Sequence, residues 1–168
     1  MSNVMHLSPT LRVATLADLP AVSELAEDLA ALHHQAWPTV FAPASGSSRD
    51  DAHWQESITG DGRVTFVAEL DGRNAGFVTL ACITETHSLF QPVRFARVNS
   101  VCVATWARGK GIGRALMQEA EAWAGAQRAS EIRLVVWAFN EPALRMYEEL
   151  GYTVRSHTLG KVLGGAGA

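Results

Sequence analysis

The feature that most constrains the fold is a pair of strand-like runs joined by Asp71-Gly72. Residues 64–70 (VTFVAEL) and 75–83 (AGFVTLACI) are both apolar and rich in β-branched and aromatic side chains. An Asp-Gly pair between two such runs is a strong signal for a tight β-hairpin. The sequence therefore predicts an antiparallel sheet against which the rest of the chain must pack.

Hydrophobic periodicity places the other elements around this hairpin. Apolar residues at three- and four-residue steps predict a helix over residues 15–34, and a buried apolar stripe predicts another over residues 112–127. A shorter helix is expected over residues 49–59, and a further one over residues 141–150, which Gly151 ends. Further strands are predicted over residues 10–14, 95–104, 132–137 and 152–157. The 132–137 run (IRLVVW) is almost continuously apolar, as expected of a strand covered on both faces. The order β-α-α-β-β-β-α-β-α-β predicts an α/β (α+β) domain with a mixed, mostly antiparallel sheet.

The length of 168 residues suits one domain with a sizeable core. We expect a flexible tail over residues 1–9, a single domain over residues 10–163 and a frayed tail over residues 164–168. Cys82 and Cys102 both lie in apolar runs, which favours two buried, reduced thiols over a disulfide scaffold.

The charge balance excludes some classes of partner. A formal net charge of -3 argues against general binding to nucleic acid or to an anionic membrane, so any anion site must be local. No apolar run approaches the roughly 18 residues of a membrane span, and the first thirty residues lack a signal-peptide core. We therefore expect a cytoplasmic protein. Adjacent His33 and His34 cannot face one metal ion from the same side of a helix, so no metal is expected.

The run ARGKGIGRAL at residues 107–116 places three glycines and several cations where a helix begins. Glycine within an element costs roughly 0.5–1 kcal/mol relative to alanine, so the run needs a reason. Bare amides at a helix N-terminus with nearby cations predict a phosphate site, although a loop tip with solvated charges is the simpler interpretation. No Walker sequence is present. A dinucleotide fingerprint starting at Gly109 would need a third glycine where Arg114 stands.

Two blocks carry a resemblance to a known family. Arg108-x-x-Gly111-x-Gly113, between a strand and a helix, resembles the R/Q-x-x-G-x-G/A loop of the GCN5-related N-acetyltransferase (GNAT) family. Downstream, Asn140-x-x-Ala143-x-x-x-Tyr147 followed by Gly151-Tyr152 (NEPALRMYEELGY) is similar to that family's second signature. Together the blocks cover about residues 98–152. The resemblance implies the GNAT fold, with a sheet of six to seven strands flanked by about four helices.

The resemblance also implies that acetyl-coenzyme A is the co-substrate. Backbone amides of the glycine loop would hold its pyrophosphate, and its pantetheine arm would lie along the preceding strand, where an NH near Val101 would polarise the thioester carbonyl. Asn140 would hold the pantetheine amide from the other side. The cofactor contacts implied in this way are Val101, Cys102, Val103, Arg108, Gly109, Lys110, Gly111, Ile112, Gly113, Arg114, Asn140 and Tyr147. The simpler interpretations are a helix N-cap for Asn140, a core aromatic for Tyr147 and plain surface charges for the cations.

The implied reaction is acetyl transfer to a primary amine by direct attack in a ternary complex. An amine with a pKa of ~10.4 is neutral in about one molecule in a thousand near pH 7.4, which costs about 4 kcal/mol. Tyr147 matches the family's tyrosine and is predicted to protonate the departing thiolate. The strand before the loop reads Arg97-Val-Asn99-Ser100, without the glutamate that many relatives carry there. Asn99 can position a water, and the base is left open among Glu85, His87, His53, His34 and bulk water.

The acceptor side follows from the same resemblance. In this family the segment after the first helix borders the acceptor cleft, so His34, Trp37 and Phe41 are predicted to contact the acceptor, with Trp54 as a further wall. These aromatic residues could instead belong to the core or to a dimer contact. A small amine, an aminoglycoside, a polyamine and a peptide N-terminus remain open as acceptors.

Three further hypotheses remain open for the function. The first is a coenzyme A-binding sensor or interaction module without turnover, which the missing glutamate motivates. The second is O-acetylation, and the third is the use of a longer acyl donor. For the assembly, the resemblance makes a homodimer plausible.

Overall fold

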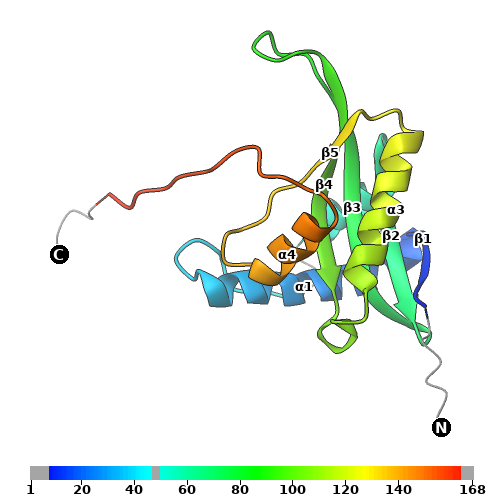
Figure 1. Ribbon diagram of the computed structural model, residues 1–168. Coiled ribbons are helices and arrows are strands. Elements are labelled where there is room, and N and C mark those ends of the chain that lie inside the picture. The colour runs from blue at the N-terminus through cyan, green and yellow to red at the C-terminus, as the bar shows by residue number, and fades with distance from the viewer. Residues whose placement is uncertain (1–7, 47–49, 164–168) are drawn as a thin grey trace. The chain divides into compact units, whose positions relative to one another are not determined.

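The computed structural model describes residues 8–46 and 50–163, and its contacts group the chain into two compact units, Met1–Val135 and Val136–Ala168. Most of both predicted tails (residues 1–7 and 164–168), and Arg49 of the second predicted helix, lie outside the described residues. The first unit contains β1 (Thr10–Val13), η1 (Leu16–Asp18), α1 (Leu19–Ala36), α2 (Asp51–Thr59), β2 (Arg63–Leu70), β3 (Arg73–Glu85), β4 (Val93–Val103), η3 (Thr105–Ala107), α3 (Ile112–Ala126) and β5 (Glu131–Arg133) (Figure 1). The second unit contains α4 (Glu141–Glu149).

The sheet of the first unit has five strands in the order β1-β2-β3-β4-β5. The first three pairings are antiparallel, and β4 pairs with β5 in parallel. Asp71 and Gly72 join β2 to β3 with φ values of 54° and 71°. Two consecutive positive φ values are the requirement of the tight turn that matches the twist of a hairpin. The predicted hairpin is therefore confirmed.

Helices cover both faces of this sheet. Leu116 of α3 lies over Gly76 on one face, while the ring of Trp54 on α2 packs against Phe77 with centroids 5.5 Å apart. Because neighbouring residues of a strand point to opposite faces, α3 and α2 must lie on opposite sides of β3. Cys102 on β4 is the cross-strand neighbour of Phe77. Its thiol donates a hydrogen bond to the carbonyl of Leu25 on α1. The core therefore sits above and below β2, β3 and β4.

The strand count departs from the sequence prediction. The 132–137 run forms a strand only over Glu131–Arg133, and residues 152–157 form none, so the described residues give five strands rather than six to seven. Within the described sheet β5 pairs on one side only, with β4, and Val135 just beyond it is 87% exposed. Apolar content favours a strand, but a strand also needs a neighbouring strand with which to form backbone hydrogen bonds. Beyond Arg133 the described sheet offers no such neighbour. The expected four helices are all present.

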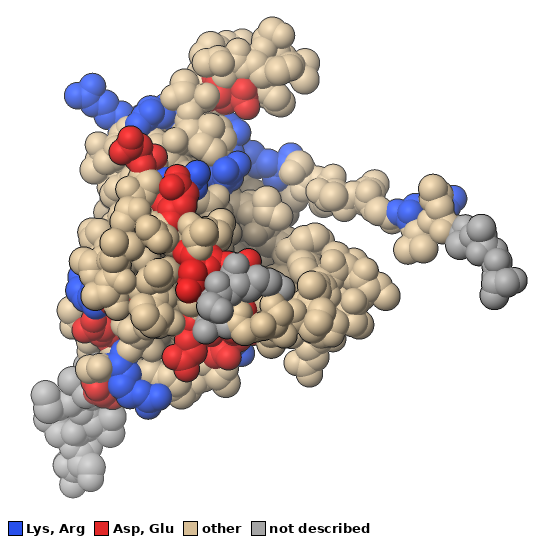
Figure 2. Space-filling model, turned by 180° about the vertical axis from the view of Figure 1, so that it is seen from behind, with Lys and Arg blue, Asp and Glu red and all other residues tan. Residues whose placement is uncertain are grey.

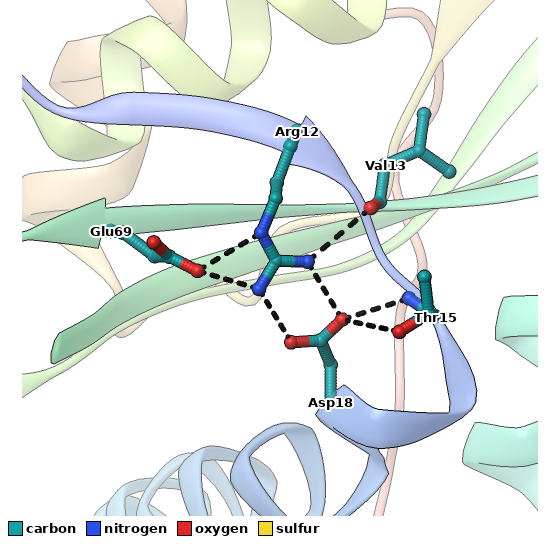
Figure 3. Close-up of polar contacts among 5 residues, drawn as sticks. All are labelled: Arg12, Val13, Thr15, Asp18 and Glu69. Carbon is teal, nitrogen blue, oxygen red and sulfur yellow. Dashed lines mark hydrogen bonds and ion pairs between the residues drawn. The ribbon is translucent and has the colours of Figure 1, made fainter. Parts of the chain in front are cut away.

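An ion-pair cluster around Arg12 links β1 to the elements next to it, as Figure 3 shows. The guanidinium of Arg12 on β1 donates to both carboxylate oxygens of Asp18, at 2.8 and 2.7 Å, and its Nε donates to Glu69 on β2 at 2.9 Å. The carboxylate of Asp18 also accepts from the amide of Thr15 at 2.8 Å. One guanidinium therefore joins β1, η1 and β2. These hydrogen bonds from Arg12 lower the pKa of Asp18 to about 2.

We expect Asp18→Asn to lower the free energy of unfolding at pH 7 by about 2 kcal/mol, because the side chain is only 7% exposed. Asp18 is ionised in the folded protein down to about pH 2, whereas the ordinary value of its pKa is 3.8. Its stabilisation is therefore complete above the ordinary value and is lost as the pH falls through 2. Urea unfolding at pH 7 and at pH 2 measures the effect.

A matched control for Asp18→Asn is Glu56→Gln. Glu56 pairs with Arg63 at 3.3 Å but is 60% exposed, so its loss should cost less than about 1 kcal/mol. Equal effects of the two variants would contradict the stabilising role assigned to the Arg12 cluster.

Candidate active site

The glycine run forms a loop between η3 and α3 with an unusual backbone. Gly109 and Gly111 have φ values of 73° and 79°, in the left-handed region that favours glycine. A Cβ built at either position meets no other atom within 4 Å. These glycines are therefore required by the conformation of the loop rather than by crowding, and the space in front of them is open.

The N-terminus of α3 presents amides without a side-chain cap. Gly111 occupies the N-cap, no side chain there accepts a hydrogen bond, and the first turn contains no acidic residue. The amide of Ala115 donates to the carbonyl of Gly111 at 3.0 Å. The preceding amides, of Gly111, Ile112 and Gly113, have no acceptor within the helix. Uncapped amides at the positive end of a helix dipole bind an anion.

Three cationic side chains lie near this loop, and one of them, Arg73, was not predicted from the sequence. Arg108 donates from Nε to the carbonyl of Val103 at 3.3 Å, which holds its side chain against the end of β4. Lys110 lies 5.5 Å from the ring centroid of Trp106, and the guanidinium of Arg73 lies 4.3 Å from the same centroid. Arg73 is remote in sequence, and only the β3–β4 pairing brings it here, so no local pattern could have shown it.

The strand that leads into the loop has an edge without a strand partner. β5 pairs with β4 only at Phe95, Ala96 and Arg97, whereas β3 pairs with β4 as far as Val103. Over residues 98–103 the side of β4 that faces away from β3 therefore has no ladder within the described sheet. An extended ligand with amide groups can add to such an edge as a further strand.

A bulge interrupts β4 at Asn99. Thr79 pairs with Ser100 and Leu80 pairs with Val98, which leaves Asn99 as the extra residue. A bulge bends the strand and redirects the groups beside it. The amide oxygen of Asn99 accepts from Nε of Arg97 at 3.0 Å, and Asn99 is exposed.

The second unit holds the two residues of the downstream signature on α4. Asn140 is the N-cap, and its side-chain oxygen accepts from the amide of Ala143 at 3.4 Å, which confirms the capping geometry. Tyr147 is buried, and its ring packs edge-on against Tyr152 with centroids 5.7 Å apart. Burial raises the pKa of Tyr147 to about 12, so its phenol keeps its proton at neutral pH.

A cavity of about 270 Å³ lies between α1 and α2 in the first unit. Its lining combines apolar and aromatic walls with carboxylates: Ala26, Glu27, Leu29, Ala30, His33, Phe41, Ala42, Asp50 and Trp54. Of the three predicted acceptor contacts, Phe41 lines the cavity, and Nδ1 of His34 lies 2.7 Å from the carbonyl of Phe41. Trp37 is 39% exposed and does not line it. Sequence reasoning missed Glu27 and Asp50, because no motif marks them.

The family follows from comparison with known proteins. Residues 26–152 match the model of the Acetyltransferase (GNAT) family. The chain belongs to the GNAT acetyltransferase family. It is 31% identical over 113 residues to streptothricin acetyltransferase of Streptomyces lavendulae, a match that covers 67% of this chain and 55% of that protein. It is also 35% identical over 94 residues to an uncharacterized N-acetyltransferase of Archaeoglobus fulgidus, covering 56% of this chain and 61% of that one. The chain thus aligns with little more than half the length of these curated relatives.

Solved structures show the same fold. A mutant of the BH1408 protein from Bacillus halodurans superposes with a TM-score of 0.86 at 20% identity, covering 92% of this chain and 99% of the other. A ribosomal-protein-alanine N-acetyltransferase from Brucella melitensis superposes with a TM-score of 0.66 at 20% identity, covering 94% and 100%. At this identity the likeness concerns the architecture alone. The predicted GNAT fold is confirmed, with the corrected strand count.

GNAT proteins use acetyl-CoA, and this chain has features that fit it. The open space before Gly109 and Gly111 can take a diphosphate on uncapped amides, and the edge of β4 can take the amide-bearing pantetheine arm. Among the described residues no group of three metal-ligating side chains occurs, and no helix there is both long and apolar enough to cross a bilayer.

The thiol of Cys102 is engaged within the core of the first unit. Its Sγ donates to the carbonyl of Leu25 at 3.1 Å, and burial raises the thiol pKa to about 12. A thiol that stays protonated is a poor nucleophile. This chemistry disfavours an acyl-cysteine route through Cys102.

Proposed function

We propose that the chain is an acetyl-CoA-dependent N-acetyltransferase that transfers an acetyl group to a primary amine by direct attack in a ternary complex. The observation that carries this proposal is the edge of β4 over residues 98–103 running into the uncapped amides of the glycine loop. When bound, acetyl-CoA supplies the activated acyl group, and the protein supplies binding and orientation.

The donor side of the site is built from main chain and cations. Amides from Gly109 to Arg114 hold the diphosphate, and the dipole of α3 adds about 0.3–1 kcal/mol or more where it is partly buried. Main-chain groups of Val101 and Val103, which point away from β3, align the pantetheine arm, with the NH near Val101 directed at the thioester carbonyl. The main-chain N–H and C=O of Cys102 point toward β3, so this residue contributes to the strand rather than to the ligand. The carbonyl oxygen of Val103 already accepts a hydrogen bond from Arg108. The backbone N–H of Val103 is therefore the group that we assign to the ligand.

Proton handling is divided between two places. The Asn99 bulge, which has no carboxylate, positions a water that takes the proton of the amine. The phenol of Tyr147, with its pKa raised to about 12, donates a proton to the departing thiolate. Asn140 caps α4 through its oxygen, which leaves its amide NH₂ group for the pantetheine carbonyl.

The cavity between α1 and α2 supports a cationic acceptor. Glu27 and Asp50 place carboxylates beside the aromatic walls of Phe41 and Trp54, a combination that binds ammonium groups. α1 and α2 contain no Lys or Arg, and Figure 2 shows Asp and Glu side chains gathered along the middle of the rear face. We therefore propose a small amine that carries a second positive charge. The relative named for streptothricin supports a small-molecule acceptor. The free Cys82 and Cys102 support a reducing, cytoplasmic location.

Release of free thiol from acetyl-CoA, followed across a panel of monoamines, diamines, aminosugars and peptide N-termini, tests the function. We expect turnover that depends on the amine, with diamines and aminosugars favoured over monoamines of equal length. Mass spectrometry of the product should show one acetyl group on nitrogen. An oxygen-linked product, or a preference for a longer acyl donor, would contradict the assigned chemistry.

Glu27→Gln sharpens this test of the acceptor. We expect it to raise KM for a diamine by about tenfold while kcat stays near wild type, since a charged hydrogen bond contributes about 1.5–3 kcal/mol. Glu24→Gln removes the same charge from an exposed position of α1 outside the cavity, so it should leave KM unchanged. If the two variants raised KM equally, the effect would come from the overall negative charge of α1 rather than from a binding site for the second ammonium group in the cavity.

A coenzyme A-binding module without turnover is the second candidate, favoured by the absence of a carboxylate on β4 near the Asn99 bulge. Calorimetry separates the two candidates. Tight binding of acetyl-CoA without thiol release across the whole amine panel would support the module and contradict the enzyme.

A further inference from the structure

A row of hydroxyl side chains crosses the sheet of the first unit and ends at the Asn99 bulge. Thr65 on β2 pairs with Thr79 on β3, and Thr79 pairs in turn with Ser100 on β4. Residues directly opposite each other on neighbouring strands point to the same face of a sheet, so these three hydroxyls share one face. We name Thr65, Thr79 and Ser100 the hydroxyl row.

The hydroxyl of Thr79 is the one that its surroundings leave unsatisfied. Thr79 is only 1% exposed, and its Oγ1 has no hydrogen-bond partner among the described residues. Its neighbour Thr65 is equally buried but donates to the carbonyl of Ser57 at 2.9 Å. Buried polar groups in native proteins are almost always hydrogen-bonded, and an ordered water is the usual partner where the protein supplies none. The position of Thr79 therefore calls for a water.

The β4 bulge supplies the other partners for such a water. The ladder between β3 and β4 shifts at Asn99, and a bulge leaves its extra residue unpaired and disrupts the ladder beside it. Ser100, directly across from Thr79, is only partly buried. The Cβ atoms of such a pair lie about 4.5–5.5 Å apart, a span that one water bridges with two hydrogen bonds of about 2.8 Å.

The hydroxyl row lies on the same face of the sheet as the proposed acceptor cavity. Thr79 follows Phe77 by two residues on β3, so both side chains point to one face, and the ring of Trp54 from the cavity wall packs on Phe77 there. Arg97 shares this face through its register with β3, and its Nε donates to the exposed side chain of Asn99 at 3.0 Å. The cavity wall, the unsatisfied hydroxyl and a route to solvent at Asn99 are thus on one side of the sheet.

We propose that Thr79 and Ser100 hold a buried water beneath the Asn99 bulge, and that this water takes the proton of the attacking amine. The inference rests on the proposed acetyl transfer and identifies the side chains that fix the water. As the bond from nitrogen to the acetyl carbon forms, the nitrogen gives one proton to the water, which passes a proton to solvent at Asn99. Tyr147 separately protonates the thiolate when the carbon–sulfur bond breaks. Thr79 remains a neutral hydroxyl throughout and acts as a positioning residue.

High-resolution crystal structures of the full chain test the water site directly. We expect an ordered water within about 3.2 Å of Oγ1 of Thr79 and of Oγ of Ser100. Thr79→Ser should keep this water, and Thr79→Val, which has the same shape without the hydroxyl, should lose it. A wild-type structure without a water on Oγ1 of Thr79 would overturn the proposal. This test needs no turnover, so it decides the water site independently of the proposed function.

Kinetics with two amines of different basicity tests the role of the water. The probes are propane-1,3-diamine and its 2,2-difluoro derivative, whose fluorines make the nitrogens less basic. With the parent diamine we expect Thr79→Val to lower kcat about tenfold at unchanged KM, and Thr79→Ser to restore it. With the difluoro derivative the loss should shrink to about twofold, because a weakly basic nitrogen gives up its proton to any nearby water.

An equal loss of kcat with both diamines would contradict the proton step. A wild type that acetylates no amine of the panel would instead contradict the proposed function, and the crystal structures then decide the water site alone.

Thr65→Val is the matched control, because it makes the same change one strand away. It removes the hydrogen bond to the carbonyl of Ser57, so its midpoint of thermal unfolding should fall while kcat stays near wild type. Thr79→Val should unfold at or above the wild-type temperature, because Oγ1 of Thr79 has no partner in the described part of the protein. If Thr65→Val lost kcat as strongly as Thr79→Val, the hydroxyl of Thr79 would have no special role and the proposal would fail.

Discussion

Gly111→Ala is expected to weaken acetyl-CoA binding by about 10- to 100-fold. Gly111 has a φ of 79°, and a left-handed conformation costs a residue with a Cβ roughly 1–2 kcal/mol. The new Cβ also enters the open space in front of the uncapped amides of α3, where the diphosphate is proposed to lie. Isothermal titration calorimetry with acetyl-CoA measures the loss.

Gly72→Ala is the matched control for this variant. Gly72 in the β2–β3 turn has a φ of 71°, and a Cβ there also meets nothing within 4 Å. The two variants carry the same backbone strain, so thermal unfolding should show similar losses of stability. Only Gly111→Ala should lose affinity for acetyl-CoA. If both variants bound the cofactor equally well, the glycine loop would not be its phosphate site.

Tyr147→Phe is expected to lower kcat by about 100-fold and to leave acetyl-CoA affinity within about twofold. The variant removes one hydroxyl and keeps the ring, and loss of a positioned general acid costs about 10²–10⁴-fold in rate. Tyr152→Phe removes a hydroxyl from the ring that packs against Tyr147, so its rate should stay near wild type. Steady-state kinetics together with calorimetry separates the effect on rate from the effect on binding.

The pH profile gives this prediction a second measurement. Because burial raises the pKa of Tyr147 to about 12, the phenol remains a proton donor throughout the neutral and mildly alkaline range. The wild-type rate should therefore rise from about pH 6 to 9 as more of the amine becomes neutral, without a descending limb from this tyrosine. Tyr147→Phe should show the same rise, with a lower rate at every pH in this range. The contrary result would be a wild-type rate that falls above pH 8 with the loss of one proton, together with a variant rate that does not change with pH. That pair of profiles would contradict the raised pKa assigned to Tyr147.

The parts of the molecule that the sequence predicts are those set by local chemistry. The Asp71-Gly72 turn, the glycine loop and the periodicity of α3 each depend on residues within a few positions of one another. The boundary of α1 was less well predicted, because Pro20 sets the first turn of the helix and leaves Leu16–Asp18 as a separate turn. The capping role that asparagine favours is confirmed for Asn140, because it too depends on a neighbour three residues away.

The parts that the sequence does not predict depend on contacts between distant segments. Arg73 reaches Trp106 only through the pairing of β3 with β4, and Glu27 and Asp50 meet at the cavity only after α1 and α2 have packed. The run 132–137 was expected to be a full strand because its composition is that of a buried one. Such a run forms a strand only where another strand lies beside it to share hydrogen bonds. The composition of the run does not predict whether that neighbour is present.

The burial of Cys102 also affects how the protein withstands electrophiles and oxidants. Disulfide exchange, alkylation and oxidation by peroxide all begin with a thiolate, and burial keeps the sulfur of Cys102 in its protonated form. Cys82 is the less buried of the two thiols, so it is the one that such reagents reach first. A chromogenic disulfide used to detect released coenzyme A is therefore not expected to modify Cys102 on β4, the strand proposed to hold the pantetheine arm.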